Sequence, residues 1–345
     1  MNGAQSRRGG RASRGLVLGL AGLLASASWA GCAVRPLAPD PTPRPARPLT
    51  AELVRHYRPA DAAPPKVQLE RVRQVGAIVT WRGTLTRALP EGPRSVAFDY
   101  FEHSDGRPRP AILCTPILGG DGTLELGVVA SFARAGFQAI LVRRNGDVFE
   151  KDWTPEDIEG EFRRYLTDRR CIVDWLALRP GVDADRIGAF GISMGGIVTT
   201  SLIAVEPRIR AAVTAMAGGD IGRILAETKE PPLVAWREHW EEQQGLAGED
   251  LVGRFRGTMV SDPMRLAPFV DPRRLLVVVS RYDDIVPTRI QRRLRRALGD
   301  PPGWEVPCGH YQAIAFLPFL RAKAIAFFRK RLGRPAPILL TGADP

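Results

Sequence analysis

A serine flanked by glycines is the first feature of this chain that could do chemistry. Ser193 stands in a Gly-x-Ser-x-Gly pattern, which is typical of a strand that turns sharply into a helix with the serine at the apex. Glycine is needed on both sides because strand, turn and helix approach too closely to leave room for a Cβ. The apolar run 187–190 favours a short buried strand before the turn, and 197–204 favours a helix after it. Ser193 is therefore the candidate nucleophile, with an ordinary Gly/Ser turn as the alternative.

A serine hydroxyl attacks only when a base removes its proton, so the four histidines of the chain are the next candidates. His310 is favoured because it lies on a loop between a predicted strand at 304–306 and a long amphipathic helix. Open α/β sheets place their reactive groups at such carboxyl ends of strands. His56 and His103 are predicted to be solvated loop residues. His239 lies in an aromatic helical segment, where packing is the expected role.

The acid that would orient this histidine has two candidates. The run 275–280 is almost unbroken in apolar residues, which predicts a strand covered on both faces. Asp283 and Asp284 follow it closely. Either aspartate could orient the imidazole or cap the next helix, which begins near Pro287. The residues alone leave this choice open.

Taken in order, these segments resemble the α/β-hydrolase superfamily, and its dienelactone-hydrolase-like members most closely. The likeness extends over about 67–332. It includes the lead-in Val-Asp-x-x-Arg-Ile-Gly at 182–188, just before the serine turn. It also includes an Asp-x-x-Val-Pro segment that begins at Asp283, with Ser280 where the family usually has glycine. This segment favours Asp283 as the orienting acid and leaves Asp284 as a helix cap.

The resemblance implies a mostly parallel, eight-stranded sheet with helices on both faces. In that fold Ser193 follows the fifth strand, Asp283 the seventh and His310 the eighth. It also implies the chemistry: the serine attacks a carbonyl, the histidine carries the proton, and the aspartate orients the imidazole. Neither a cofactor nor a metal site is expected.

Acyl transfer also needs N–H donors aimed at the developing oxyanion. The resemblance implies one donor at Met194, directly after the nucleophile, and a second in the loop after the predicted strand 111–115. That loop lacks the histidine-glycine pair that the family usually carries there. Alignment on its glycines favours Leu118 as the second donor, with Ile117 as the alternative.

The hydrolase domain is expected at 66–333, followed by a C-terminal tail at 334–345. Between the sixth and seventh predicted strands, residues 222–267 lose the strand pattern and become helical. Members of the superfamily often carry a cap over the serine at this point. Trp236 and Trp240 lie one helical turn apart in this segment, and we expect them to form the substrate side of the cap.

The N-terminal residues predict export. Residues 1–31 contain arginines, no acid and a short apolar run, which together resemble a secretory signal peptide. The step before Cys32 resembles a bacterial lipobox, although Trp29 stands where leucine is usual, so Cys32 is the candidate for lipidation. The alternative is ordinary cleavage near Ala30. Residues 32–65 are rich in proline and are predicted to be a stiff tether that holds the domain off a membrane.

The composition is that of one globular enzyme, with 345 residues of which 44% are hydrophobic. Part of the net charge of +12 belongs to the signal segment, and the remaining arginines often neighbour acids. This pattern disfavours nucleic-acid binding and favours attraction to an anionic envelope surface. Cys114, Cys171 and Cys308 are expected to be free thiols.

These features predict an exported serine hydrolase of the bacterial cell envelope, lipid-anchored or else periplasmic or secreted. The expected substrates are small or medium carboxylic esters, cleaved through an acyl-enzyme. A peptidase or a perhydrolase using the same three residues is the alternative within the fold. A non-catalytic envelope lipoprotein is the alternative outside enzymes.

Overall fold

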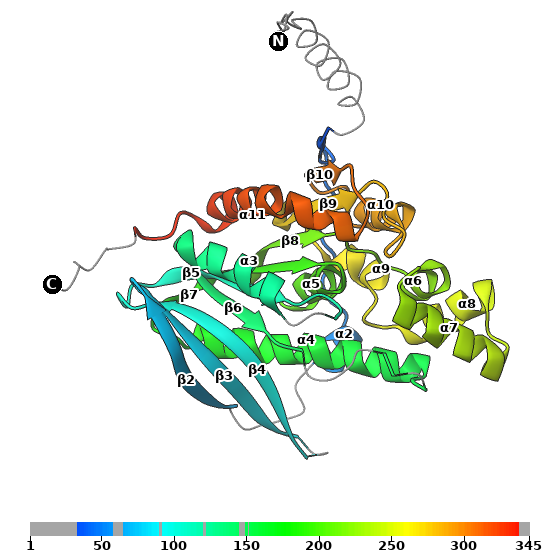
Figure 1. Ribbon diagram of the computed structural model, residues 1–345, viewed down its shortest axis with the longest axis horizontal. Helices are drawn as coiled ribbons and strands as arrows, with labels where there is room; N and C mark the ends of the chain where they lie inside the picture. The colour runs from blue at the N-terminus through cyan, green and yellow to red at the C-terminus, as the bar shows by residue number, and fades with distance from the viewer. Residues whose placement is uncertain are drawn as a thin grey trace, which may run out of the picture.

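A ten-stranded sheet forms the centre of the protein (Figure 1). The computed structural model describes residues 33–57, 65–89, 92–119, 122–144, 149–150 and 152–337. The predicted signal peptide and Cys32 therefore lie outside the described residues. The strands are β1 (Arg35–Leu37), β2 (Lys66–Val75), β3 (Ile78–Leu89), β4 (Gly92–His103), β5 (Arg109–Thr115), β6 (Gln138–Val142), β7 (Val182–Ile192), β8 (Ile209–Ala215), β9 (Leu275–Ser280) and β10 (Gly303–Val306).

Helices connect the strands and cover the sheet. The α-helices are α2 (Ala51–His56), α3 (Thr123–Arg134), α4 (Pro155–Ala177), α5 (Met194–Val205), α6 (Ile221–Glu227), α7 (Pro231–Gln244), α8 (Gly248–Thr258), α9 (Pro263–Leu266), α10 (Thr288–Ala297) and α11 (Leu317–Leu332). Short 3₁₀ helices are η1 (Ala267–Phe269), η2 (Pro272–Arg274) and η3 (Tyr311–Phe316).

The strand order is β1-β10-β9-β8-β7-β5-β6-β4-β3-β2. The six strands from β10 to β6 in this order run parallel, and antiparallel strands lie at both ends. The expected eight-stranded sheet corresponds to β3–β10, so the fold class is confirmed and the strand number is corrected to ten. The two additional strands, β1 and β2, form the two edges of the sheet. β2 was missed because most of its side chains are exposed, so its sequence has no apolar alternation.

Alternate residues of the central strands face opposite hydrophobic layers. In β5, Ala111 and Leu113 pack into one layer, while Ile112 and Cys114 pack into the other. Helices α4, α5 and α10 cover the first layer, and α3 and α11 cover the second (Figure 1). A strand covered on both faces is apolar at successive positions, which explains the unbroken apolar runs.

The run Tyr311–Leu332, which comprises η3 and α11, would be long and apolar enough to cross a membrane by length and composition. In the structure, Leu320, Ala324 and Phe328 of this run are buried against the sheet. The run is therefore a covering element of the domain. Its first turn, η3, has no buried residue.

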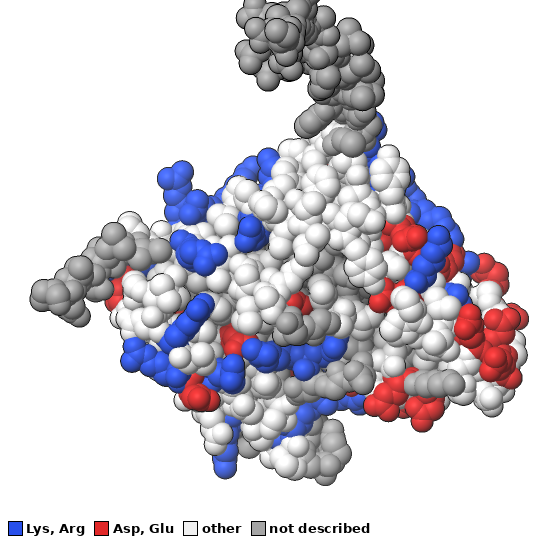
Figure 2. Space-filling view, viewed as in Figure 1, with Lys and Arg blue, Asp and Glu red and all other residues white. Residues whose placement is uncertain are grey.

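Charged side chains of both signs lie on the face shown in Figure 2, and acidic ones gather over α7 and α8. The arginine-rich helix α10 is largely paired with acids. Arg292 lies 2.6 Å from Glu305, and Arg293 lies 3.1 Å from Asp220. The positive charge of α10 is thus partly neutralised within the fold.

The proline-rich N-terminal segment packs on the domain over its described part. β1 pairs antiparallel with β10, with Pro36 opposite Trp304. Further along, the backbone N–H of Arg47 donates to the carbonyl of Pro268, 2.9 Å away, and Leu53 of α2 is buried. The prediction of a stiff tether is therefore wrong for 33–57. Prolines did not prevent packing because an edge strand needs backbone donors on one side only.

The packed N-terminal segment predicts a stability difference between two neighbouring aliphatic residues of α2. Leu53 is 8% exposed and Val54 is 51% exposed. Leu53→Ala should lower the free energy of unfolding by about 2–3 kcal/mol, because it leaves a cavity beneath the helix. Val54→Ala should change it by less than about 0.5 kcal/mol. Urea unfolding of both variants tests this, and equal small effects would mean that α2 does not pack on the domain in solution.

Candidate active site

The parallel strands bring the predicted site residues to one edge of the sheet. Ser193 follows β7, Asp283 follows β9 and His310 follows β10. These strands and β8 are neighbours and run parallel, so their carboxyl ends lie at the same edge. Residues far apart in the chain therefore meet there.

Close backbone contacts shape the turn that carries Ser193. A Cβ on Gly191 would lie 2.1 Å from the carbonyl oxygen of Gly195, and one on Gly195 would lie 2.4 Å from that of Thr115. Ser193 itself has φ 54°, a left-handed conformation that costs a non-glycine residue about 1–3 kcal/mol. Its N–H donates to the carbonyl of Ala215 on β8, 2.8 Å away, which helps to hold the turn.

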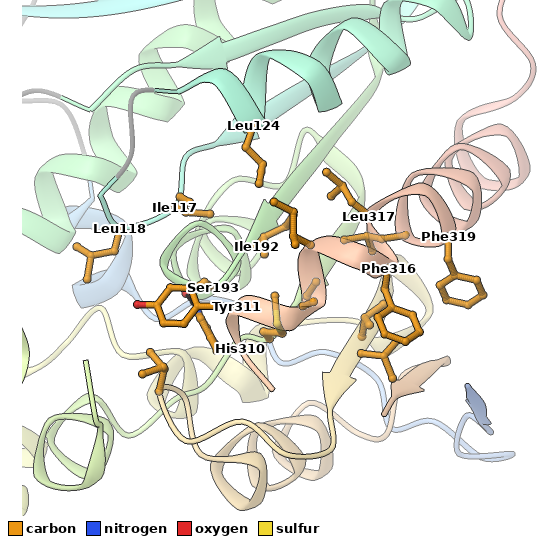
Figure 3. A pocket seen from close by; sticks show the side chains of 18 of the residues that line it. Ile117, Leu118, Leu124, Ile192, Ser193, His310, Tyr311, Phe316, Leu317 and Phe319 are labelled. Atoms are coloured by element: carbon orange, nitrogen blue, oxygen red, sulfur yellow. Dashed lines mark hydrogen bonds between the residues drawn. The ribbon is translucent and has the colours of Figure 1, made fainter. Parts of the chain in front are cut away.

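Ser193, His310 and Asp283 form one hydrogen-bonded chain. Ser193 Oγ lies 2.8 Å from His310 Nε2, and His310 Nδ1 lies 2.8 Å from Asp283 Oδ2. Because a carboxylate only accepts hydrogen bonds, Nδ1 carries the proton and Nε2 is left to accept from the serine. The Asp283 side chain is fully buried and that of His310 is 10% exposed. Figure 3 shows Ser193 and His310 side by side at the pocket. The arrangement suits proton removal from the serine.

Gln291 of α10 holds the aspartate and was missed from the sequence. Its Nε2 donates to Asp283 Oδ2 over 2.9 Å, and its Oε1 accepts from the N–H of Ser280 over 3.0 Å. The other carboxylate oxygen accepts from the N–H groups of Ile285 and Val286. One signal was available: Gln291 is a lone polar residue on the otherwise apolar inner side of an arginine-rich helix.

The two neighbouring aspartates have different surroundings. Asp284 is on the surface, with 55% of its side chain exposed, and its carboxylate lies 3.2 Å from Lys229 Nζ. It has no contact with His310 among the described hydrogen bonds and ion pairs. Asp283 alone of the two reaches the imidazole.

The loop after β5 runs beside Ser193, and one of its two candidate donors is already hydrogen-bonded within the loop. The N–H of Ile117 donates to Glu125 Oε1 over 3.1 Å, so it is occupied within the loop. Ile117 and Leu118 both line the larger cavity at Ser193, and Leu118 also lines the smaller one. Met194 begins α5, where the first N–H groups have no partner inside the helix. The geometry thus favours Leu118 over Ile117.

Two other histidines, His56 and His103, form contacts with residues other than Ser193. His103 is buried at the end of β4, with Nε2 3.0 Å from the carbonyl of Ala133, so the expectation of a solvated loop residue was wrong. Burial lowers the pKa of His103. His56 contacts Glu159 over 3.1 Å and anchors α2. Both were misplaced because their sequence surroundings are polar.

The three described cysteines are buried and form no disulfide among the described residues. Burial, assisted by the nearby charge of Asp283, raises the pKa of Cys308 and keeps this thiol protonated. Its carbonyl accepts a hydrogen bond from the hydroxyl of Ser280, which ties the loop before His310 to the end of β9. Among the described residues, no cluster of three or more His, Cys, Asp or Glu side chains could hold a metal ion.

Two apolar cavities meet at Ser193. The larger has a volume of about 170 Å³ and lies between α3 and the η3–α11 run (Figure 3). The smaller has a volume of about 40 Å³ and extends towards α6 and α7. Ser193 and Leu118 line both.

The inserted helices α6–α9 contribute to the smaller cavity, but not through the tryptophans. Trp236 is 1% exposed, stacks on Trp240 and donates from its indole N–H to the carbonyl of Trp153. Neither tryptophan lines either cavity at Ser193. Leu225 and Leu233 line the smaller cavity instead. The prediction that the tryptophans form the substrate side of a cap is therefore wrong, and they pack the insertion itself.

Two acetyl xylan esterases are among the solved structures that superpose on this chain. Acetyl xylan esterase 1 from Thermoanaerobacterium sp. superposes with a TM-score of 0.59 at 19% identity, covering 78% of this chain and 92% of that one. An acetyl xylan esterase from Paenibacillus sp. R4 superposes with a TM-score of 0.58 at 17% identity, covering 79% and 91%. At these identities the likeness shows the α/β-hydrolase fold.

Sequence comparison gives the family. The protein NocK from Nocardia uniformis subsp. tsuyamanensis, described as an esterase, is 28% identical over 206 residues, which are 58% of this chain. The chain spans only 56% of NocK. The model of the prolyl oligopeptidase family matches residues 128–301, about half of the chain, and includes Ser193 and Asp283. The chain therefore belongs to the prolyl oligopeptidase family of serine hydrolases.

Proposed function

We propose that the protein hydrolyses small or medium carboxylic esters through an acyl-enzyme on Ser193. The observation that carries the proposal is the hydrogen-bonded chain from Ser193 Oγ through His310 to the buried Asp283, beginning at a strained turn. The esterase descriptions of NocK and of the two acetyl xylan esterases support an ester substrate. The cavity volumes support a small or medium one.

In the proposed reaction each residue has a defined role. Ser193 Oγ attacks the ester carbonyl carbon while His310 Nε2 takes its proton, and Asp283 stabilises the imidazolium that forms. The N–H groups of Met194 and Leu118 donate to the oxyanion. His310 then protonates the departing alcohol, leaving an acyl group on Ser193. A water molecule, deprotonated by His310, releases the carboxylic acid and restores the serine.

A peptidase using the same three residues is the second candidate, because the matching family is named for oligopeptidases. The apolar lining of the cavities is the observation against it, since a peptide carries a polar backbone that needs hydrogen-bond partners. Comparing kcat/KM for an alkyl ester and for a prolyl peptide anilide separates the two.

Ser193→Ala should abolish ester hydrolysis, with a loss of about 10⁴–10⁶ in kcat, because it removes the hydroxyl that is hydrogen-bonded to His310 Nε2. The fold should be retained, since alanine removes only one hydroxyl. A fluorophosphonate should label the wild-type protein at Ser193 and leave the variant unlabelled. Residual activity above a tenth of the wild-type value would assign the chemistry to another residue.

The paired aspartates provide a matched test of the orienting acid. Asp283→Asn should lower kcat by about 10⁴, because an amide at this position favours the wrong tautomer of His310. Asp284→Asn, one residue along the chain, should keep kcat within severalfold of wild type, since its carboxylate contacts Lys229 at the surface. Steady-state kinetics on both variants decide, and the reverse ranking would move the orienting role to Asp284.

We further propose that the protein is exported and anchored to a membrane by lipid on Cys32. The support is the order of the N-terminal features: arginines, an apolar run and then cysteine. The full-length protein should partition with membranes, and mass spectrometry should find a lipid-modified N-terminus at Cys32. Cys32→Ser should release it into the soluble fraction. An unmodified mature N-terminus near Ala30 would agree with a cleaved signal peptide but would contradict the lipid anchor.

A further inference from the structure

We propose that the two cavities at Ser193 divide the ester between them, so that the preferred substrate is an acetate or propionate of an apolar alcohol with about six carbons. This inference rests on the ester-hydrolase function proposed above and names its substrate class. The larger cavity would hold the alcohol, and the smaller one would hold the acyl group.

The lining of the larger cavity favours an apolar group. Leu124 of α3 and Ile192 of β7 lie on one side of it, and Phe316 and Leu317 of the η3–α11 run lie on the other (Figure 3). Glu230 is the one carboxylate among the described lining residues. It accepts a hydrogen bond from the hydroxyl of Tyr311 at the mouth, which raises the pKa of Tyr311 to about 12.

The volume of this cavity sets the size of that group. It is about 170 Å³. An apolar protein cavity of about 150 Å³ takes up benzene, which has six carbons. Each methylene that moves from water into such a site strengthens binding roughly fourfold. Preference should therefore rise steeply with chain length up to about six carbons and stop when the cavity is full.

The smaller cavity leaves room for one or two carbons. Its volume is about 40 Å³, roughly a quarter of the apolar cavity of about 150 Å³ that takes up benzene with its six carbons. Ile197 of α5, Ile221 and Leu225 of α6 and Leu233 of α7 surround it. These side chains are buried in the hydrophobic layer that α4, α5 and α10 cover. The cavity therefore cannot widen unless the inserted helices repack.

The two cavities differ in which catalytic group they contain, and this difference gives the orientation. His310 lines the larger cavity and not the smaller one. Its Nε2 must protonate the leaving oxygen, so the alcohol departs on the side of the larger cavity. Met194, whose N–H is one of the two proposed oxyanion donors, lines only the smaller cavity, whereas Leu118 lines both. The acyl carbon chain therefore extends towards that side.

A pair of isomeric esters tests this orientation. Hexyl acetate and ethyl hexanoate have the same formula and nearly the same hydrophobicity, but the long chain is on the alcohol in the first and on the acyl group in the second. Acid release followed in a pH-stat should give a kcat/KM at least tenfold higher for hexyl acetate. Equal values or the opposite preference would overturn the inference.

Two tryptophan substitutions on one helix connect the preference to the cavity. Leu124→Trp should fill the larger cavity and lower the ratio of kcat/KM for hexyl acetate to that for methyl acetate at least tenfold. Leu126→Trp is the matched control, because Leu126 is partly buried on the same helix but does not line the cavity. The inference fails if the control lowers the ratio equally or if Leu124→Trp does not lower it.

Fluorophosphonate labelling separates this failure from failure of the proposed function. A wild-type protein that is labelled at Ser193 and hydrolyses both isomers equally keeps its ester-hydrolase function, and only the division of the cavities is wrong. A wild-type protein that is neither labelled nor active on either isomer overturns both.

Discussion

The close approach of helix α5 to strand β5 is the constraint on which the site depends. It exists because Gly195 has no side chain, and any Cβ there would meet the carbonyl oxygen of Thr115 at 2.4 Å. The same contact sets the strained backbone of Ser193 at the start of the helix and fixes the N–H of Met194 beside it. It also places the end of β5 next to the serine, so the loop that carries Leu118 begins within the site. The proposed nucleophile and the proposed oxyanion donors thus depend on the same backbone packing.

The positions of Ser193 and Asp283 could be predicted from the sequence, because they depend on backbone geometry and on the order of the strands. The glycines around Ser193 indicate a strained turn, and the apolar run before Asp283 indicates a buried strand, so their meeting at one sheet edge follows from parallel pairing. Gln291 was not predictable in the same way, because its role depends on the rotation of α10 about its axis. His103 shows the opposite error: its polar neighbours belong to a turn, while its ring lies against α3 in the interior.

The insertion between β8 and β9 illustrates a second limit. Aromatic residues at helical spacing identify an apolar helix face, but they do not say what that face meets. Trp236 stacks on Trp240 and contacts Phe255, and its indole N–H donates to a backbone carbonyl. Large aromatic side chains stabilise a small helical unit most when they are buried inside it. The smaller aliphatic side chains remain at its boundary with the serine.

The pairing of β1 with β10 affects the order in which the chain can fold. Arg35–Leu37 meets Gly303–Val306, so the first described strand of the chain has the last one as its neighbour. This contact joins two strands that most of the chain separates, so forming it has a high cost in loop-closure entropy. We therefore expect β1 and β10 to pair late in folding. Until then β10 presents unpaired backbone groups at the edge of a nearly complete sheet, where another molecule could pair with them. β10 has only four residues, which limits how much chain an incorrect partner could capture.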